Sequence, residues 1–178
     1  IIYGEVIIRG KSEYDYIKNI IRRNYFMCGI VGYIGQRDCT DVLMQGLEKL
    51  EYRGYDSAGI AVFEKTGIKT VKTKGKLADM RHKLDIEGSP VGHCGIGHTR
   101  WATHGEPSDI NSHPHTNGRV TIVHNGIIEN YIELKEFLTE KGYTFTSQTD
   151  TEVVACLLDY YYSERNPLRA ITETLKEL

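Results

Sequence analysis

Apolar and polar residues follow one another along the chain in blocks that predict strands and helices in turn. Short apolar runs bounded by glycine or turn residues predict strands, because about four to eight apolar residues in a row are typical of a buried strand. Two of these runs lie on either side of Thr66-Gly67 and predict a β-hairpin. The predicted strands span residues 28–34, 58–64, 68–74, 96–99, 119–124 and 143–146.

Other stretches carry apolar residues three or four positions apart, which places them on one face of a helix. One such helix is expected to begin at a cap formed by Thr40 or Asp41, and a second, 127–141, to end at Gly142. A third, 151–162, is expected behind an Asp150 cap, and a fourth opens at Asn166-Pro167. Three of the predicted apolar faces carry Leu43, Leu47 and Leu50; Ile127, Tyr131, Leu134 and Leu138; and Leu168, Ile171 and Leu175.

The chain is expected to contain one domain, preceded by a segment of different character. Residues 1–27 are rich in isoleucine and tyrosine, and charged residues such as Glu5 and Arg9 interrupt the apolar runs, unlike the core of a secretory signal. We expect residues 1–27 to be a non-native leader, either translated upstream sequence or a pro-segment removed before Cys28. Residues 28–178 have the length of about one domain. That domain is expected to be C-terminally truncated, because the last predicted helix is still running at Leu178.

Composition and charge narrow the class of protein. Hydrophobic residues make up 40% of the chain and the formal net charge is −2, with no long apolar run and no block of lysine and arginine. We therefore expect a soluble, cytoplasmic protein that binds neither nucleic acid nor membranes. The four cysteines lack the spacing of a disulfide framework, which favours reduced thiols.

The dipeptide Met27-Cys28 gives the first candidate for catalysis. Removal of an initiator methionine would make Cys28 the first residue, so that one residue carries both a thiol and a free α-amine. An α-amine has an unperturbed pKa of about 7.7–8.0, which allows it to act as a general base at neutral pH. Cys28 is therefore a candidate nucleophile that supplies its own base.

Asn125-Gly126 offers a side-chain N–H and a backbone N–H next to each other. Two such donors stabilise the oxyanion of a tetrahedral intermediate, and removal of one typically costs about 10²–10³ in rate. The same dipeptide is common in type I′ turns, and this alternative stays open from the sequence alone.

Several polar motifs occur in an order that resembles the class II glutamine amidotransferases. Within that class, the fuller match is similar to the glutaminase domains of the isomerising glutamine–fructose-6-phosphate aminotransferases, the glucosamine-6-phosphate synthases. The resemblance implies an α+β fold, the N-terminal-nucleophile hydrolase four-layer αββα sandwich, with Cys28 as nucleophile and Asn125 and Gly126 as oxyanion hole. The motifs lie at 27–32, 51–59, 98–106, 113–115, 123–130 and 148–152.

The resemblance also implies which residues bind glutamine. Arg100 matches the family's arginine for the substrate α-carboxylate, which suits a bidentate guanidinium, and Asp150 matches its aspartate for the α-ammonium. Thr103 and His104 lie on the same loop as Arg100 and are expected to complete the pocket. A purely structural hydrogen bond is an open alternative for His104.

Three further residues have two interpretations each. By resemblance, Trp101 gates the passage of ammonia to a second active site; as the only tryptophan, it is alternatively a core aromatic residue. By resemblance, Arg53 and Tyr55 lie in a loop near the nucleophile and the closing lid. Either residue can equally fix the geometry of that loop.

The seven histidines are potential metal ligands, especially His113 and His115 together with His98 and His104, since His113 and His115 would share one face of a strand. No Cys-x-x-Cys or His-Glu-x-x-His motif accompanies them. We therefore expect no metal and no cofactor. The remaining cysteines, Cys39, Cys94 and Cys156, are expected to be small buried residues.

With the resemblance, these residues predict hydrolysis of L-glutamine to glutamate and ammonia through a γ-glutamyl thioester on Cys28. The resemblance further implies that the ammonia reaches fructose 6-phosphate in sugar isomerase domains absent from this chain, giving glucosamine 6-phosphate for amino-sugar biosynthesis in a homodimeric protein. Two alternatives stay open. One is another class II enzyme, such as an amidophosphoribosyltransferase or asparagine synthetase, and the other is a non-catalytic glutamine-binding module in which Cys28 is not N-terminal.

Overall fold

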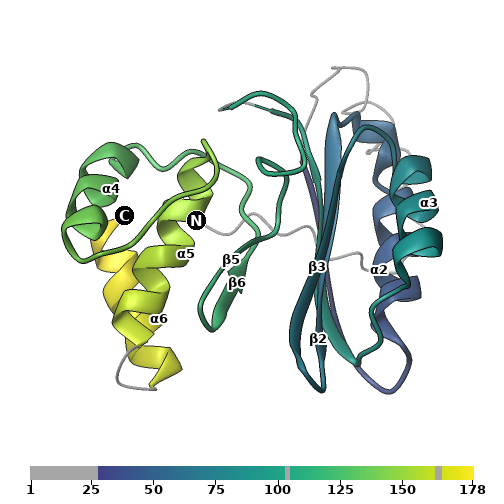
Figure 1. Ribbon diagram of the computed structural model, residues 1–178, viewed down its shortest axis with the longest axis horizontal. Coiled ribbons are helices and arrows are strands. Elements are labelled where there is room, and N and C mark those ends of the chain that lie inside the picture. Colours follow the sequence, from purple (N-terminus) through teal and green to yellow (C-terminus); the bar gives the residue numbers. More distant parts are fainter. Residues whose placement is uncertain (1–27, 103–104, 163–165) are drawn as a thin grey trace, which may run out of the picture.

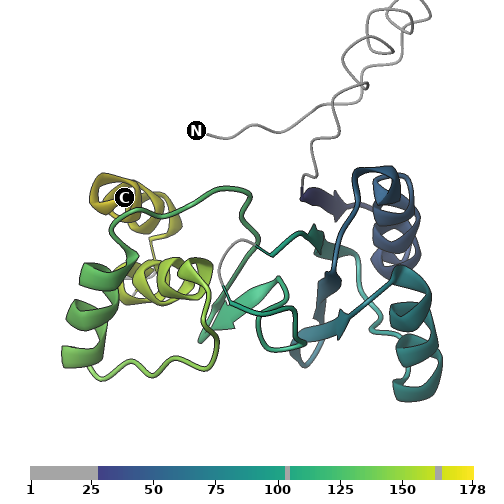
Figure 2. The same ribbon diagram turned by 90° about the horizontal axis from the view of Figure 1, so that it is seen from above.

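A computed structural model describes residues 28–102, 105–162 and 166–178 of the chain. The expected leader, 1–27, and the pocket residues Thr103 and His104 lie outside the described residues. Four layers follow one another across the molecule: two helices, a four-stranded sheet, a two-stranded hairpin and three further helices (Figure 1). The view from above has the same order of layers (Figure 2).

The larger sheet has the strand order β1-β4-β2-β3, and each neighbouring pair is antiparallel. Its strands are β1 (Gly29–Ile34), β2 (Ser57–Glu64), β3 (Gly67–Lys74) and β4 (Cys94–Arg100). Strands β2 and β3 pair from Ser57 with Lys74 to Glu64 with Gly67, which confirms the predicted hairpin. Strand β4 lies between β1 and β2, so its end at Arg100 is in the middle of the sheet.

Helices α2 (Cys39–Glu48) and α3 (Leu77–Glu87) cover one face of this sheet (Figure 1). Full burial of a leucine or isoleucine side chain contributes about 1.5–3 kcal/mol, so this interface is a main source of stability. Its fully buried side chains are Leu43, Met44, Leu47, Ile60, Val62, Leu77 and Met80. The cap of α2 is Asp38, whose carboxylate accepts from the backbone N–H of Thr40 at 3.0 Å, and the expected Thr40 or Asp41 cap is wrong.

Helix α3 was absent from the pattern-based prediction. Its buried residues Leu77, Met80 and Leu84 are surrounded in the sequence by charged residues, which weakens the amphipathic signal. The N-terminal end is stabilised by Asp79, whose side chain accepts from the backbone N–H of Lys76 at 2.8 Å. In a capping box the cap residue is serine or threonine, whose side chain also accepts a hydrogen bond from the helix, and this sequence signal is missing here because a lysine, which cannot accept, stands in that position.

The second half of the molecule begins with the hairpin of β5 (His115–Asn117) and β6 (Val120–Ile122). It packs against α5 (Asp150–Tyr161), which also contacts α4 (Tyr131–Glu140) and α6 (Pro167–Glu177). A second apolar core lies among these helices, built around Leu134, Leu138, Val153, Cys156 and Leu157. The two cores are separated by the polar layer that holds the candidate site.

Several predicted boundaries in this half are wrong. Helix α4 begins at Tyr131 rather than at Ile127, which is 57% exposed, and it ends before Gly142, whose φ of +89° suits glycine. The strand expected at 119–124 is reduced to β6, and residues 143–146 form no strand. Thr149 caps α5, because its hydroxyl accepts from the backbone N–H of Glu152. Asp150 is the first residue of that helix rather than its cap.

Helix α6 forms where predicted but turns its other face inward. Leu168, Ile171 and Leu175 are 76%, 46% and 65% exposed, whereas Ala170 and Thr174 are buried. The small side chains allow α6 to approach α5 closely, and the apolar stripe therefore faces away from that contact. The predicted helix is confirmed and its predicted inward face is wrong. None of the helices in the described part of the chain is long and apolar enough to span a bilayer.

Candidate active site

Cys28 lies at the edge of the sheet where β1 begins and β4 ends. The antiparallel pairing of Gly29 with Thr99 brings it next to Trp101, whose backbone N–H donates to Cys28 Sγ at 3.2 Å. The backbone N–H of Gly29 donates to Thr99 Oγ1 at 3.1 Å, which fixes the chain directly after the cysteine. The backbone of Trp101 thus contacts the half-buried thiol, and the Thr99 side chain fixes the residue that follows Cys28.

The environment of Cys28 keeps the thiol protonated at rest. Burial raises its pKa, while the hydrogen bond from Trp101 and the positive charge of Arg100 act in the opposite direction and are smaller. A thiol whose pKa is raised needs a base when it attacks a substrate. This requirement agrees with the sequence-based hypothesis that the α-amine of Cys28 takes the proton.

Asn125 reaches Cys28 from the segment that follows β6. Its Nδ2 donates to the backbone carbonyl oxygen of Cys28 at 3.1 Å, and its Oδ1 lies 2.7 Å from Nε2 of His98. One Nδ2 hydrogen therefore points to the backbone of the nucleophile and a second hydrogen is left on the same nitrogen. Gly126 follows with φ +157°, which does not fit a type I′ turn, so that alternative interpretation is wrong.

Arg100 is buried at the end of β4. Its Nη2 donates to the carbonyl oxygen of Gly105 at 3.2 Å. Burial lowers its pKa, and the carboxylates of Asp56 and Asp150 act against that shift, Asp56 more strongly. The structure therefore places Arg100 close enough to interact electrostatically with the candidate nucleophile, Cys28, and with Asp150, the other residue expected to bind glutamine.

Asp150 connects the start of α5 to the segment of Asn125. Its buried carboxylate accepts through Oδ2 from the backbone N–H of Ile128 at 2.8 Å, and through Oδ1 from the hydroxyl of Thr151 at 3.3 Å. Asp150 is the first residue of α5, an end of a helix where acidic side chains are favoured. Asp150 thus holds the loop after Asn125 in place while it keeps an anionic side chain near the site.

Asp56 was overlooked in the sequence. Its carboxylate accepts from the backbone N–H of Ala102 and from Ser57 Oγ, and its own N–H donates to the carbonyl oxygen of Arg100 at 2.8 Å. Asp56 therefore ties the loop after β4 to the start of β2. Its place in the polar motif 51–59 was the available signal, but the motif alone does not say which of its residues faces Arg100.

Trp101 does not belong to the core. Its side chain is 39% exposed, so the core interpretation is wrong, and the gating interpretation stays a prediction. Its backbone contributes to the site through the hydrogen bond to Cys28.

The loop residues Arg53 and Tyr55 make different contacts. The Tyr55 hydroxyl accepts from the backbone N–H of Leu77 at 2.8 Å and donates to Glu51, so it joins the loop to the start of α3. Burial, and then the hydrogen bond to Glu51, raise the pKa of Tyr55 to about 12. The Arg53 guanidinium lies 5.7 Å from the centre of the Tyr52 ring. These contacts agree with a role in fixing loop geometry, particularly for Tyr55.

Three histidines form a buried stack between the sheet and α5. The rings of His98 and His113 are parallel with centroids 4.3 Å apart, and His115 meets His113 edge-on at 4.8 Å. Burial lowers the pKa of His98 to about 4 and that of His115 to about 3, so both are neutral at pH 7. No cluster of three potential ligands for a metal ion occurs among the residues that the structure describes.

The other cysteines are not equivalent. Cys39 and Cys156 are fully buried, as predicted, but Cys94 at the start of β4 is exposed and its expected burial is wrong.

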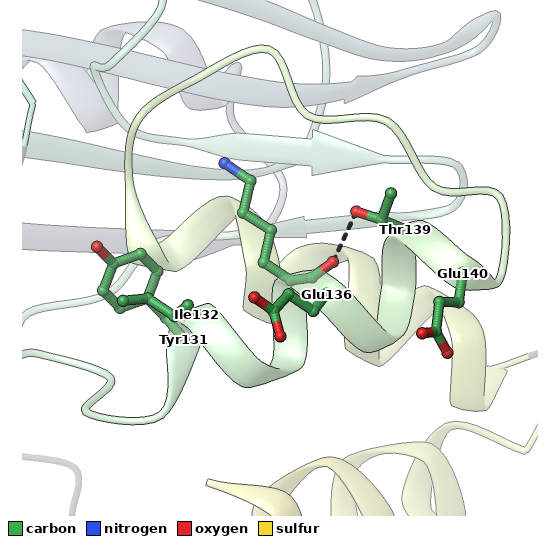
Figure 3. A pocket seen from close by; sticks show the side chains of 6 residues that line it. Tyr131, Ile132, Glu136, Thr139 and Glu140 are labelled. Atoms are coloured by element: carbon green, nitrogen blue, oxygen red, sulfur yellow. Dashed lines mark hydrogen bonds between the residues drawn. The ribbon is translucent and has the colours of Figure 1, made fainter.

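A hollow lies elsewhere, along α4 (Figure 3). It measures about 630 Å³ and is lined from that helix alone by Tyr131, Ile132, Lys135, Glu136, Thr139 and Glu140. The hydroxyl of Thr139 donates to the carbonyl oxygen of Lys135 within the helix. None of the candidate site residues lines this hollow, so the chemistry is located by the convergence of side chains around Cys28.

Comparison with known proteins defines the class. The sequence profile of the glutamine amidotransferase domain matches residues 69–164, which is more than half of the chain, and the chain belongs to this family.

Two solved structures have the same fold. One is the glutamine phosphoribosylpyrophosphate amidotransferase of B. subtilis, with a TM-score of 0.70 and 25% identity over 84% of this chain and 32% of that chain. The other, described as the allosteric regulatory enzyme of purine biosynthesis, has a TM-score of 0.71 and 26% identity over 84% of this chain and 33% of that chain. These neighbours confirm the predicted α+β N-terminal-nucleophile hydrolase fold.

Relatives with high sequence identity indicate a more specific family within this class. The chain is 63% identical to the isomerising glutamine–fructose-6-phosphate aminotransferase of Clostridium tetani over 76% of its length, 60% identical to that of Clostridium perfringens over 85%, and 56% identical to that of Thermus thermophilus over 84%. These relatives confirm the resemblance seen in the motifs. The chain spans 22% of the first relative and 25% of the other two.

Proposed function

We propose that the chain is the glutaminase part of an isomerising glutamine–fructose-6-phosphate aminotransferase, and that it hydrolyses L-glutamine. The observation that carries the proposal is the convergence of Asn125 Nδ2 and the Arg100 charge on Cys28, each delivered by a different layer of the fold. The family membership and the names of the relatives support the same activity.

The chemistry follows from the positions of the donors. Cys28 Sγ attacks the side-chain carboxamide carbon of glutamine, and the α-amine of Cys28 takes the thiol proton. The negative charge that develops on the amide oxygen is stabilised by Asn125 Nδ2 and the backbone N–H of Gly126. The tetrahedral intermediate collapses as the leaving nitrogen takes the proton from the α-ammonium and departs as ammonia. Water then hydrolyses the thioester and releases glutamate.

Substrate binding is assigned by charge. The buried guanidinium of Arg100 binds the α-carboxylate of glutamine, and Asp150 binds the α-ammonium. Thr103 and His104 complete the pocket. Trp101 gates the exit of ammonia, and Arg53 and Tyr55 belong to the loop that closes over the substrate.

The proposed base requires a free α-amine on Cys28. Residues 1–27 form the leader in this proposal and residues 28–178 the amidotransferase domain. The test is an intact-mass measurement combined with a glutaminase assay on two forms of the protein, one beginning at Cys28 and one retaining the leader. Only the form that begins at Cys28 is expected to release ammonia. Equal activity in the form that retains the leader would contradict the proposal.

The acceptor reaction is proposed from the relatives. Their shared name supports transfer of the ammonia to fructose 6-phosphate. The proposal also includes glucosamine 6-phosphate as the product and a cytoplasmic homodimer that binds no nucleic acid or membrane. A phosphoribosylpyrophosphate acceptor is the second candidate, because one of the two structural neighbours is named for that substrate. Their identities of 25% and 26%, against 56–63% for the three aminotransferases, favour the first candidate.

A further inference from the structure

The amide group of Asn125 has only one orientation that satisfies its surroundings. One end lies 3.1 Å from the carbonyl oxygen of Cys28, which can only accept, so this end must be Nδ2. The other end is therefore Oδ1, and it lies 2.7 Å from Nε2 of His98. Because an amide oxygen can only accept, His98 Nε2 must carry the hydrogen of this bond.

The His98 ring can provide only this one hydrogen. The side chain is fully buried, and burial lowers its pKa to about 4, so the ring is a neutral imidazole at pH 7. A neutral imidazole has a single N–H, and the acceptor on Asn125 decides which nitrogen carries it. The tautomer of His98 and the amide orientation of Asn125 therefore depend on each other.

Neighbouring rings hold the plane of His98. His113 stacks on it at 4.3 Å with an angle of 18°, and His115 closes the stack from the side. Nε2 of His115 lies 2.9 Å from the hydroxyl of Thr149, the residue that caps α5. The Nδ1 of His113 accepts from the backbone N–H of His124 at 3.3 Å, directly before Asn125 in the chain. The stack thus joins β4, the hairpin layer and α5.

We propose that His98 is a positioning residue that holds the Asn125 amide with its nitrogen toward the nucleophile. If the amide turned over, Oδ1 would face the place where the substrate oxyanion forms, and attraction would become repulsion. His98 itself does not touch the substrate. This inference rests on the proposed hydrolysis of glutamine, since the amide of Asn125 matters for rate only in that reaction.

The matched variants are His98→Gln and His98→Met in the protein that begins at Cys28. The glutamine side chain carries its N–H at the same number of bonds from Cβ as His98 Nε2, whereas methionine fills a similar space without a donor. We expect His98→Met to lower kcat for glutamine hydrolysis about 10²-fold, the effect of losing one oxyanion donor, with KM nearly unchanged. His98→Gln is expected to restore most of kcat. Equal rates for the two folded variants would overturn the proposal.

A double variant separates positioning from any other role of His98. If His98 acts only through Asn125, His98→Met lowers kcat in the native background but causes no further loss in the Asn125→Ala background. A loss of the same size in both backgrounds would mean that His98 acts by another route, and the proposal would fail.

The Asn125 side-chain amide signal in a ¹⁵N–¹H spectrum gives a readout that does not depend on activity. We expect His98→Gln to preserve its position and slow proton exchange, and His98→Met to change both. An unaltered signal in His98→Met overturns the positioning role even if the native protein hydrolyses no glutamine, an outcome that would overturn the proposed function separately. If His98→Met does not fold, His98→Gln decides: a folded variant that loses both kcat and the amide signal contradicts the proposal.

Discussion

Gly59 is a position where the sheet and the second layer approach each other closely, and Gly59→Ala tests how tightly they are joined. It lies on β2 and pairs with His98 on β4. A Cβ at this position would lie 2.0 Å from the carbonyl oxygen of His113 and 3.1 Å from Cδ of Pro114. The absence of a side chain at residue 59 is therefore what allows His113 to stack on His98.

The cost of the substitution follows from this distance. The first contact must lengthen by about 1 Å to reach the shortest separation that real Cβ atoms show, and the nearest atom belongs to the backbone, which cannot rotate away. Overpacking of this kind costs about 1–3 kcal/mol. For a chain of this size, that corresponds to a fall in Tm of about 2–12 °C. The matched control is Gly32→Ala on β1, where a Cβ would have no neighbour within 4 Å.

Thermal and urea unfolding of the two variants, with glutamine hydrolysis measured in parallel, provide the assay. We expect Gly32→Ala to be as stable as the native protein, since the position is open and alanine restricts the unfolded chain. Gly59→Ala is expected to be less stable and also to lose rate, because movement of His113 disturbs the ring that orients Asn125. If Gly59→Ala unfolds at the same temperature as Gly32→Ala, the close approach of the two layers is wrong.

Three further predictions concern the nucleophile, the start of α5 and pH. Cys28→Ala should abolish ammonia release while glutamine binding, measured by calorimetry, is largely kept; residual turnover would contradict the role of Cys28. Thr149→Ala should lower the free energy of unfolding by about 1 kcal/mol, as loss of a cap does, whereas Asp150→Asn should leave stability nearly unchanged and raise KM for glutamine. His98 and His115 have folded-state pKa values of about 4 and about 3, below the ordinary 6.5, so the unfolded chain binds more protons between these values. Their contribution to stability is therefore complete above pH 6.5 and declines as the pH falls toward 4, and an unchanged urea midpoint between about pH 7 and about pH 5 would contradict it.

The sequence predicted those elements whose structure follows from residues that are neighbours in the chain. The hairpin of β2 and β3 has a clear turn at Thr66-Gly67, and both strands form as expected. Helix α3 was not predicted, because only three of its side chains are buried and charged residues surround them in the sequence. Helix α6 shows the opposite difficulty, since its strongest apolar stripe is not the face that packs. The face of α6 that packs is determined by the distance between α6 and α5. That distance cannot be derived from the residues of α6 alone.

The candidate site was predictable to the extent that its chemistry is carried by distinctive residue types. Cys28, Asn125, Arg100 and Asp150 were selected from the sequence, and the structure brings them together. The residues that hold them were overlooked, because aspartate at position 56 and histidine at position 98 look like ordinary polar residues near strand ends. Their importance comes from hydrogen bonds to residues far along the chain, such as the bond between His98 and Asn125.

These long-range bonds have a consequence for the stability of the site relative to the fold. Cys28 and Arg100 belong to the layer of the large sheet, whereas Asn125 and Asp150 come from the part of the chain that begins with the hairpin. Each layer has its own apolar core, so each can retain its packing while the contact between them loosens. The two hydrogen bonds that hold Asn125 in the site, to Cys28 and to His98, are individually worth about 0.5–1.5 kcal/mol, much less than either core. Mild denaturant should therefore separate Asn125 from Cys28, and abolish glutamine hydrolysis, before either core unfolds.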